Sequence, residues 1–316
     1  MRWGVVVPSN RPDRLRTFLE AWRPLFDRHN VRLFVVRDEA PWTGIPGWIP
    51  RGTDAIRSWG IAQAHRVGCT HILSLDDDVA PVRLDGAGGA PVDVFAEYGR
   101  VFRAGAVVSP WLSVGAWTDT GREMRGFPHA DAPRRTVAVQ YGGWWGVPDL
   151  DGVTQRAHPS ADATFAPLVL PVPVGVPLTC CAMNFALRAD FALAAWQLPV
   201  TNADRHFDRW CDIWSGLIQK RVADACGLAV VVNGAASVRH TRASDTETNI
   251  RKEAPGYPVH SGLWEALEVA GINTQSVMGA WLQTTEALAW HVESQGGGQW
   301  ALRMRRDRDL WAELFS

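Results

Sequence analysis

Three consecutive carboxylates, Asp76, Asp77 and Asp78, directly follow the apolar run at residues 71–75. Adjacent carboxylates repel one another, and a divalent cation or hydrogen-bond donors would offset that repulsion. In an extended segment Asp76 and Asp78 point to one side and Asp77 to the other, so the outer two form a D-x-D pair able to share a metal. A hard cation held in this way can bridge both phosphates of a nucleotide-sugar and stabilise a departing diphosphate. An acidic surface turn is the alternative interpretation.

Other polar and aromatic groups are candidates for the same site. His240 follows a β-rich run at residues 228–232 and is a candidate third metal ligand. Asp212 lies in a segment that mixes charge with aromatic residues, where a carboxylate could bind sugar hydroxyls or act as a base. A helix with an aromatic core stripe and solvated charges explains that segment equally well. Trp144 and Trp145 could stack on a sugar ring or a base, or simply fill the core.

Strands of a parallel sheet must position these groups. Residues 5–7 read as a strand, and Pro12 is typical of the first turn of a helix. A second strand is expected at residues 31–36, a helix at 54–67 and a third strand at 71–75. This alternation predicts a parallel sheet with right-handed crossovers, and binding groups collect at the carboxyl ends of such strands. Asp38 and the acidic triplet both follow strands.

The rest of the chain is less regular. Residues 80–180 read as rich in loops, and the pattern is mainly helical from residue 191 onward, with a break at Gly296-Gly297-Gly298. We expect one catalytic domain over residues 1–260 and a helical C-terminal extension over 261–316.

Composition excludes several classes of protein. Lys and Arg total 32 against 33 Asp and Glu, and this near-neutral balance argues against a general nucleic-acid binder. The five cysteines form no C-x-x-C pair, which argues against a disulfide framework or a zinc knuckle. The most apolar stretch, residues 165–178, carries four prolines and is not a membrane span. Because no signal-peptide pattern is present, we expect a cytoplasmic location.

Five further blocks follow one another in order: residues 124–128 (MRGFP), 143–151 (GWWGVPDLD), 181–186 (CAMNFA), 209–214 (RWCDIW), and 240–244 (HTRAS) followed by 249–253 (NIRKE). They resemble the V-R-G-Y-P, G-L-W-x-x-P-D-Y-D, C-G-M-N-L-A, R-Y-D-D-M-W and H-S-K-A-S…N-L-K-K-E segments of the reversibly glycosylated polypeptide family. That family includes the plant UDP-arabinopyranose mutases. The likeness runs from the first strand to about residue 265.

The resemblance implies a glycosyltransferase-A-like fold and a flavin-free, divalent-metal-dependent mutase that interconverts pyranose and furanose forms of a nucleotide-sugar. It implies that Asp76, Asp78 and His240 hold manganese or magnesium. Arg125 falls on the family's reversibly glycosylated arginine. The substrate-binding residues expected with it are Arg11, Asp38, Trp144, Trp145, Asn184 and Lys252.

A mechanism follows from this assignment. The anomeric bond breaks toward an oxocarbenium-like state that neighbouring carboxylates, Asp77 among them, stabilise electrostatically. Asp212 is the candidate for handling hydroxyl protons. We assign Arg125 an electrostatic role, because a guanidinium with a pKa above about 12 is a poor nucleophile.

One departure separates this chain from the family: the paired aspartates before M-W become Cys211-Asp212. A glycosyltransferase that uses a separate acceptor is the second reading, with the same metal site. A non-catalytic nucleotide-sugar-binding subunit is the third, and Cys211 is its only support. The uridine or guanosine base stays open, as does a homo-oligomer formed through the Trp-rich C-terminal helices.

Overall fold

A computed structural model describes residues 1–37, 44–84, 89–111, 124–158, 162–199, 207, 209–242 and 245–316. Its strands are β1 (Trp3–Pro8), β2 (Arg32–Val36), β3 (His71–Leu75), β4 (Val79–Pro81), β5 (Ala106–Val107), β6 (Arg134–Arg135), β7 (Val137–Gly146), β8 (Val169–Pro171), β9 (Asn184–Arg188) and β10 (Ala229–His240).

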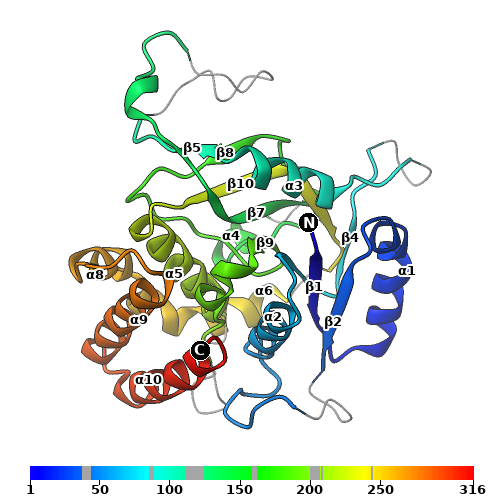
Figure 1. The fold of residues 1–316 in the computed structure, drawn as a ribbon. Helices are drawn as coiled ribbons and strands as arrows, with labels where there is room; N and C mark the ends of the chain where they lie inside the picture. The colour runs from blue at the N-terminus through cyan, green and yellow to red at the C-terminus, as the bar shows by residue number, and fades with distance from the viewer. Residues whose placement is uncertain are drawn as a thin grey trace.

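Helices connect and flank the strands (Figure 1). The α-helices are α1 (Pro12–Arg28), α2 (Ile56–Arg66), α3 (Val94–Ala104), α4 (Gly152–Ala157), α5 (Cys211–Ala225), α6 (Thr246–Glu253), α7 (Tyr257–His260), α8 (Leu263–Val269), α9 (Val277–Ser294) and α10 (Gly298–Glu313). Short 3₁₀ helices are η2 (His129–Asp131), η3 (Ala189–Ala195) and η5 (Ala254–Gly256).

Eight of the described strands form one large sheet in the order β2-β1-β3-β9-β7-β10-β4, with β8 added beside β10, and β5 and β6 form a separate two-stranded sheet. β1 pairs parallel with β2 and β3, and β10 pairs parallel with β7. β9 runs antiparallel between β3 and β7. The α/β fold with parallel strands in the first third is therefore confirmed, while the sheet as a whole is mixed.

Helices cover both faces of the sheet because successive strand residues point to opposite sides. Val5 and Leu73 pack with α1 and α3 in one core cluster, and Val6 and Ile72 pack with α2, η3 and α5 in another. The second cluster continues into α9 and α10, so the C-terminal helices share a core with the sheet. The indole N–H groups of Trp300 and Trp311 donate to backbone carbonyls of residues 199 and 193, which anchors α10 to that core.

Two expectations about local structure were wrong. Residues 137–146, expected within a loop-rich region, form the ten-residue strand β7 in the middle of the sheet. The acidic triplet does not continue β3 as an extended segment; it lies in the turn between β3 and β4. The turn forms because Thr241, just after β10, donates both its N–H and its hydroxyl to the carbonyl of Asp78, at 3.1 and 2.8 Å.

None of the helices in the described ranges has both the length and the apolar character needed to cross a membrane.

Candidate active site at the carboxyl ends of the strands

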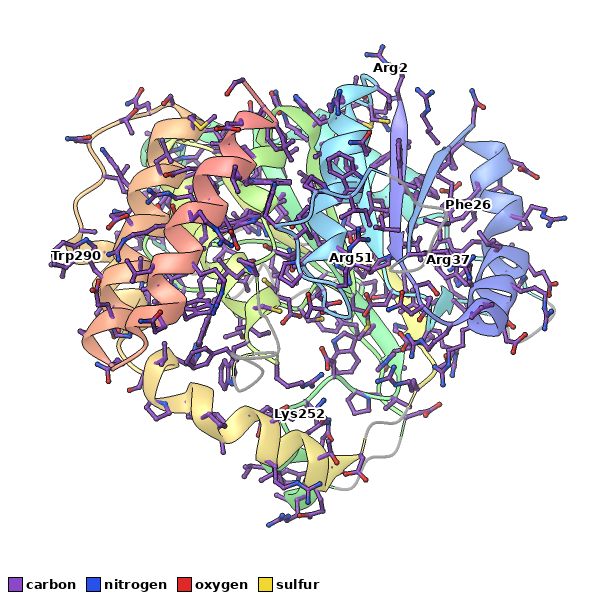
Figure 2. All side chains as sticks on the ribbon, turned by 90° about the horizontal axis from the view of Figure 1, so that it is seen from below. Arg2, Phe26, Arg37, Arg51, Lys252 and Trp290 are labelled. Carbon is purple, nitrogen blue, oxygen red and sulfur yellow. The ribbon has the colours of Figure 1, made fainter. Side chains whose placement is uncertain are left out.

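A cavity of about 490 Å³ opens where β1 and β3 end. Figure 2 views this end of the molecule, with Lys252 on α6 and Trp290 at the outer edge on α9. The cavity is lined by the triplet together with Ser9, Cys181 and charged or titratable residues from distant segments: Arg11, Asp54, Arg57, Asp149, Arg209, Asp212, His240, Arg242 and Lys252. Folding thus gathers opposite charges from both halves of the chain in one hollow.

Asp77, the middle residue of the triplet, is an anchor for Arg11. Its side chain is fully buried. One carboxylate oxygen accepts from Ser9 Oγ at 2.6 Å and from Arg11 Nε at 3.1 Å, and the other pairs with Arg11 Nη2. Burial by itself would lower the pKa of Arg11, but the hydrogen bond and charge of Asp77, with the charges of Asp78 and Asp76, raise it. The geometry makes Asp77 a positioning residue for this guanidinium.

Asp76, the first residue of the triplet, forms an ion pair with Arg57. The Arg57 side chain is 1% exposed, pairs with Asp76, and donates to Ser74 Oγ at 2.6 Å. Asp54 lies 3.7 Å from the same guanidinium. Burial by itself would lower the pKa of Arg57, but the charges of Asp76 and Asp54 outweigh it and raise the pKa.

Asp78 has two carboxylate oxygens in different situations. Oδ2 lies 3.4 Å from Arg11 Nη2 and 3.3 Å from Arg242 Nη1. Oδ1 is buried and has no hydrogen-bond partner among the described residues. Burial and the charge of Asp76 raise the pKa of Asp78, whereas His240, Arg11 and Arg242 act in the opposite direction.

His240 lies beside Asp78, because residue 240 of β10 pairs with Val79 of β4. Its ring is half-buried, and Nδ1 donates to the carbonyl of Val147 at 2.8 Å. That bond fixes the tautomer in which Nε2 carries the lone pair, as metal-binding histidines require.

A divalent cation fits some of these donors. In the described part of the chain no group of three or more His, Cys, Asp or Glu side chains is arranged to hold a metal ion. Asp78 Oδ1 and His240 Nε2 are nevertheless suitable donors, and magnesium often takes few protein ligands and completes its shell with water and substrate phosphates. Asp76 also lines the cavity, but its Oδ1 pairs with Arg57, and its role as a metal ligand stays a prediction.

Asp212 is the most perturbed carboxylate of the cavity. It is half-buried at the start of α5 and accepts from the N–H groups of Ala182 at 3.2 Å and of residue 213 at 3.0 Å. Burial raises its pKa to about 7, the charges of Asp54 and Asp149 add to the rise, and the Ala182 N–H and Arg209 oppose it. A carboxyl that titrates near neutrality can both accept and donate a proton at physiological pH.

A second cavity of about 400 Å³ adjoins the first and shares Asp54, Asp149, Cys181, Arg209 and Asp212 with it. It adds the rings of residues 210, 257 and 260. Burial raises the pKa of the Cys181 thiol well above its usual value, as do the charges of Asp149 and Asp212 and the thiol's hydrogen bond to Asp149. Cys181 is therefore a thiol here, and a nucleophilic thiolate is disfavoured.

Several predicted substrate-binding residues do not line either cavity. The Asn184 side chain is buried: Oδ1 accepts from Tyr98 at 2.8 Å, and Nδ2 donates to the carbonyls of residues 143 and 236. Trp144 packs edge-on against Phe165 with ring centres 5.9 Å apart. Trp145 is also on β7 and half-buried. The Asn184 and Trp144 side chains thus have packing partners within the structure, and the substrate-binding roles of all three residues stay predictions.

Arg125 is a further predicted site residue that lines neither cavity. Arg125 is exposed in the structure. Asp38 lies outside the described residues. Arg11, Lys252, Asp212 and the triplet with His240 are brought together as expected.

Sequence reasoning missed five charged residues of the site: Asp54, Arg57, Asp149, Arg209 and Arg242. Asp149, Arg209 and Arg242 stand inside three of the blocks noted above, which was the available signal. Nothing in the pattern marked Arg57, because a helical arginine reads as solvent-exposed until the tertiary structure buries it.

Cys211, the departure from the family pattern, is 1% exposed and belongs to the core. It lines neither cavity, so the missing carboxylate at this position leaves the charges of the cavities intact. The reading as a non-catalytic subunit loses its support.

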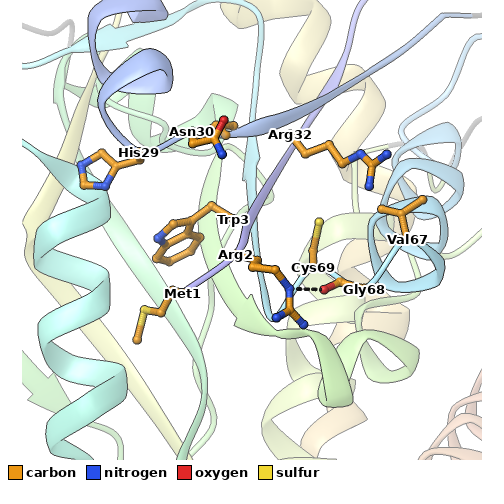
Figure 3. A pocket seen from close by; sticks show the side chains of 10 residues that line it. Met1, Arg2, Trp3, His29, Asn30, Arg32, Val67, Gly68 and Cys69 are labelled. Carbon is orange, nitrogen blue, oxygen red and sulfur yellow. Dashed lines mark hydrogen bonds between the residues drawn. The ribbon is translucent and has the colours of Figure 1, made fainter.

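A third cavity, of about 380 Å³, lies at the opposite, amino end of β1 (Figure 3). Its lining includes Arg2, Arg32 and Cys69 and no carboxylate. It lacks paired acidic and basic groups, so the cavity at the carboxyl ends is the better candidate for catalysis.

The fold is that of an α/β protein whose polar cavity lies at the carboxyl ends of its strands, where proteins of this class commonly bind small ligands. Residues 53–277 match the family model described as reversibly glycosylated polypeptide, so the chain belongs to that family.

Curated relatives are distant but extensive. UDP-arabinopyranose mutase 1 of Oryza sativa subsp. japonica is 26% identical over 282 residues, which cover 80% of this chain and 73% of the relative. UDP-arabinopyranose mutase 1 of Arabidopsis thaliana is also 26% identical, over a region that covers 80% of this chain and 74% of the relative. Among solved structures, a glycosyltransferase involved in glycosylation of the major capsid of PBCV-1 covers 81% of this chain and 98% of its own, with 11% identity and a TM-score of 0.34. That structural likeness is too distant to argue from.

Proposed function

We propose that the protein is a flavin-free, divalent-metal-dependent mutase that interconverts the pyranose and furanose forms of a UDP- or GDP-linked sugar. The observation that carries the proposal is the joined pair of cavities. The first cavity is lined by arginine and lysine side chains suited to a diphosphate. The adjoining cavity is lined by carboxylates and aromatic rings suited to a sugar. The mutase names of the relatives support the reaction class.

Manganese or magnesium would be held by Asp78 and His240. When bound, such an ion would draw electron density from the diphosphate and make it a better leaving group. Arg11, fixed by Asp77, and Lys252 would bind the diphosphate and keep it near the sugar after the anomeric bond breaks.

Asp212 would handle the protons of ring opening and closure. Its pKa of about 7 lets it accept a proton from one hydroxyl and return it to another without a large energetic penalty. Asp149 and Asp54, which raise that pKa, would add negative charge that stabilises an oxocarbenium-like state. Arg125 would have to approach the cavity to contribute, because it is exposed in the structure.

The test is incubation of the purified protein with UDP-arabinopyranose, and separately with GDP-linked sugars, in the presence of manganese alone. NMR of the products should show a furanose nucleotide-sugar. Asp78→Ala should abolish turnover, and Arg125→Ala should do so if the arginine acts at the cavity. Unchanged ring-interconversion rates in these purified variants would contradict the roles assigned to Asp78 and Arg125.

A glycosyltransferase is the second candidate, because the adjoining cavity of about 400 Å³ could receive an acceptor. It predicts no new furanose nucleotide-sugar with donor and metal alone, and transfer only after an acceptor is supplied.

A further inference from the structure

The basic groups around the acidic turn are more exposed than the carboxylates that they contact. The side chains of Asp77 and Asp78 are 0% and 7% exposed. Those of Arg11, Arg14 and Arg242 are 39%, 44% and 44% exposed. The triplet residues Asp77 and Asp78 thus form a buried layer, and a ligand that enters the cavity meets the guanidinium groups of Arg11 and Arg242, which line it.

These guanidiniums converge on one atom. Arg242 Nη1, Arg11 Nη2 and Arg14 Nη1 lie 3.3, 3.4 and 3.8 Å from Asp78 Oδ2. A single carboxylate oxygen accepts only two good hydrogen bonds, whereas each guanidinium carries five N–H donors. Asp78 Oδ2 therefore cannot satisfy the donors of three guanidiniums, and N–H groups that do not bind Asp77 or Asp78 can bind a ligand.

The local charge favours an anion. Three guanidiniums face the two carboxylates of Asp77 and Asp78, which leaves an excess of one positive charge. Asp76 does not cancel that excess, because it pairs with the buried Arg57. Asp78 offsets part of the mutual repulsion of these converging guanidiniums, and a further anion bound beside them would offset more of it.

Resting on the nucleotide-sugar function proposed above, we propose that Arg242 and Arg14 join Arg11 in a guanidinium clamp that binds the diphosphate directly. Arg11 and Arg14 come from the start of α1, after β1, and Arg242 follows β10, so the clamp closes from two sides of the acidic turn. Planar guanidiniums match phosphate oxygens in bidentate fashion. The start of α1 adds its favourable field for anions.

Asp77 and Asp78 are positioning residues in this arrangement, since they act by holding the arginines. The arginines contact Oδ2 of Asp78 and leave Oδ1 to other partners. The clamp can therefore operate with or without a cation, and the diphosphate should bind in the absence of metal.

The experiment is calorimetric titration of the full-length protein with inorganic pyrophosphate and with UDP in buffer containing EDTA. Wild type should bind both. Arg242→Gln should weaken binding about tenfold or more, because it removes charge-assisted hydrogen bonds. Arg14→Gln should weaken it less, and Arg242→Lys should be intermediate because it keeps the charge without the planar fork.

Matched controls are available in the same segments. Arg239→Gln and Arg16→Gln remove exposed arginines that pair with Asp162 and Asp13. Both should bind pyrophosphate as wild type does. Circular dichroism melts would check that every variant folds. The Arg242→Lys variant would show whether weaker binding at position 242 comes from the lost guanidinium or from a folding defect.

Three results would overturn the clamp: no metal-free binding by wild type, an Arg242→Gln affinity equal to that of Arg239→Gln, or equal weakening in the control variants. These results are independent of turnover. Metal-free pyrophosphate binding with no furanose product would remove the mutase proposal and leave the clamp standing. Furanose product together with unchanged pyrophosphate binding in Arg242→Gln would remove the clamp and leave the mutase proposal standing.

Discussion

Replacement of Asp212 by Asn should stabilise the protein at alkaline pH while it abolishes turnover. The folded-state pKa is about 7, above the ordinary value of 3.8. Between these values the folded protein holds a proton that the unfolded chain has released, so the free energy of unfolding falls as pH rises. The slope is about 1.4 kcal/mol per pH unit, and the penalty reaches its full size above the folded pKa.

The magnitude can be compared at about pH 5 and about pH 9. Over the two pH units below the folded pKa, wild type should lose about 3 kcal/mol that Asp212→Asn does not lose. The asparagine also loses one of the two backbone hydrogen bonds that the carboxylate accepts, a cost of about 1 kcal/mol. That loss is nearly independent of pH and cancels when the two pH values are compared.

The assay is urea denaturation of wild type and Asp212→Asn at both pH values in EDTA, with turnover measured on the same preparations. Asp309→Asn, whose side chain is 64% exposed, controls for the change of charge. The stability difference between Asp212→Asn and wild type should shift by about 3 kcal/mol in favour of the variant from pH 5 to pH 9. A difference that is the same at both pH values would refute the inferred burial of this carboxyl and its proton-transfer role.

Three further predictions follow from named contacts. Gly142→Ala should destabilise the fold by about 3 kcal/mol or more in urea titrations, because the added Cβ would clash with Asn184 Nδ2 and lie 2.6 Å from a backbone carbonyl. Gly47→Ala should not destabilise the fold, because its Cβ would lie in open space. Asp77→Asn should leave the protein folded but weaken pyrophosphate binding, because Arg11 loses its charged anchor; affinity equal to wild type would contradict the anchoring role. His240→Gln should weaken manganese binding, measured by calorimetry without nucleotide; unchanged affinity would remove His240 from the metal site.

Local pattern was sufficient for the first third of the fold. The alternation of apolar runs and helical stretches predicted β1, α1, β2, α2 and β3, because period and capping residues are local properties. The ends of those strands located Asp76–Asp78, and the resemblance of five ordered blocks indicated the family that the comparison with the family model then showed.

The strand β7 was hidden because its paired glycines read as a loop. Gly142 is there for a tertiary reason: the side chains of Asn184 and Tyr98 occupy the space where its Cβ would lie. The same contacts explain why Asn184, predicted to bind substrate, is instead buried in the sheet.

The partners of the acidic triplet were decided by tertiary structure alone. The sequence by itself determined that three adjacent carboxylates need positive charge or donors, since their repulsion is a local property. It did not determine that Arg57 from α2, Arg11 from the start of α1 and Arg242 from beyond β10 supply that charge. Long-range pairing depends on which strand ends meet and how far burial lowers the local dielectric, and neither property belongs to any single segment of the chain.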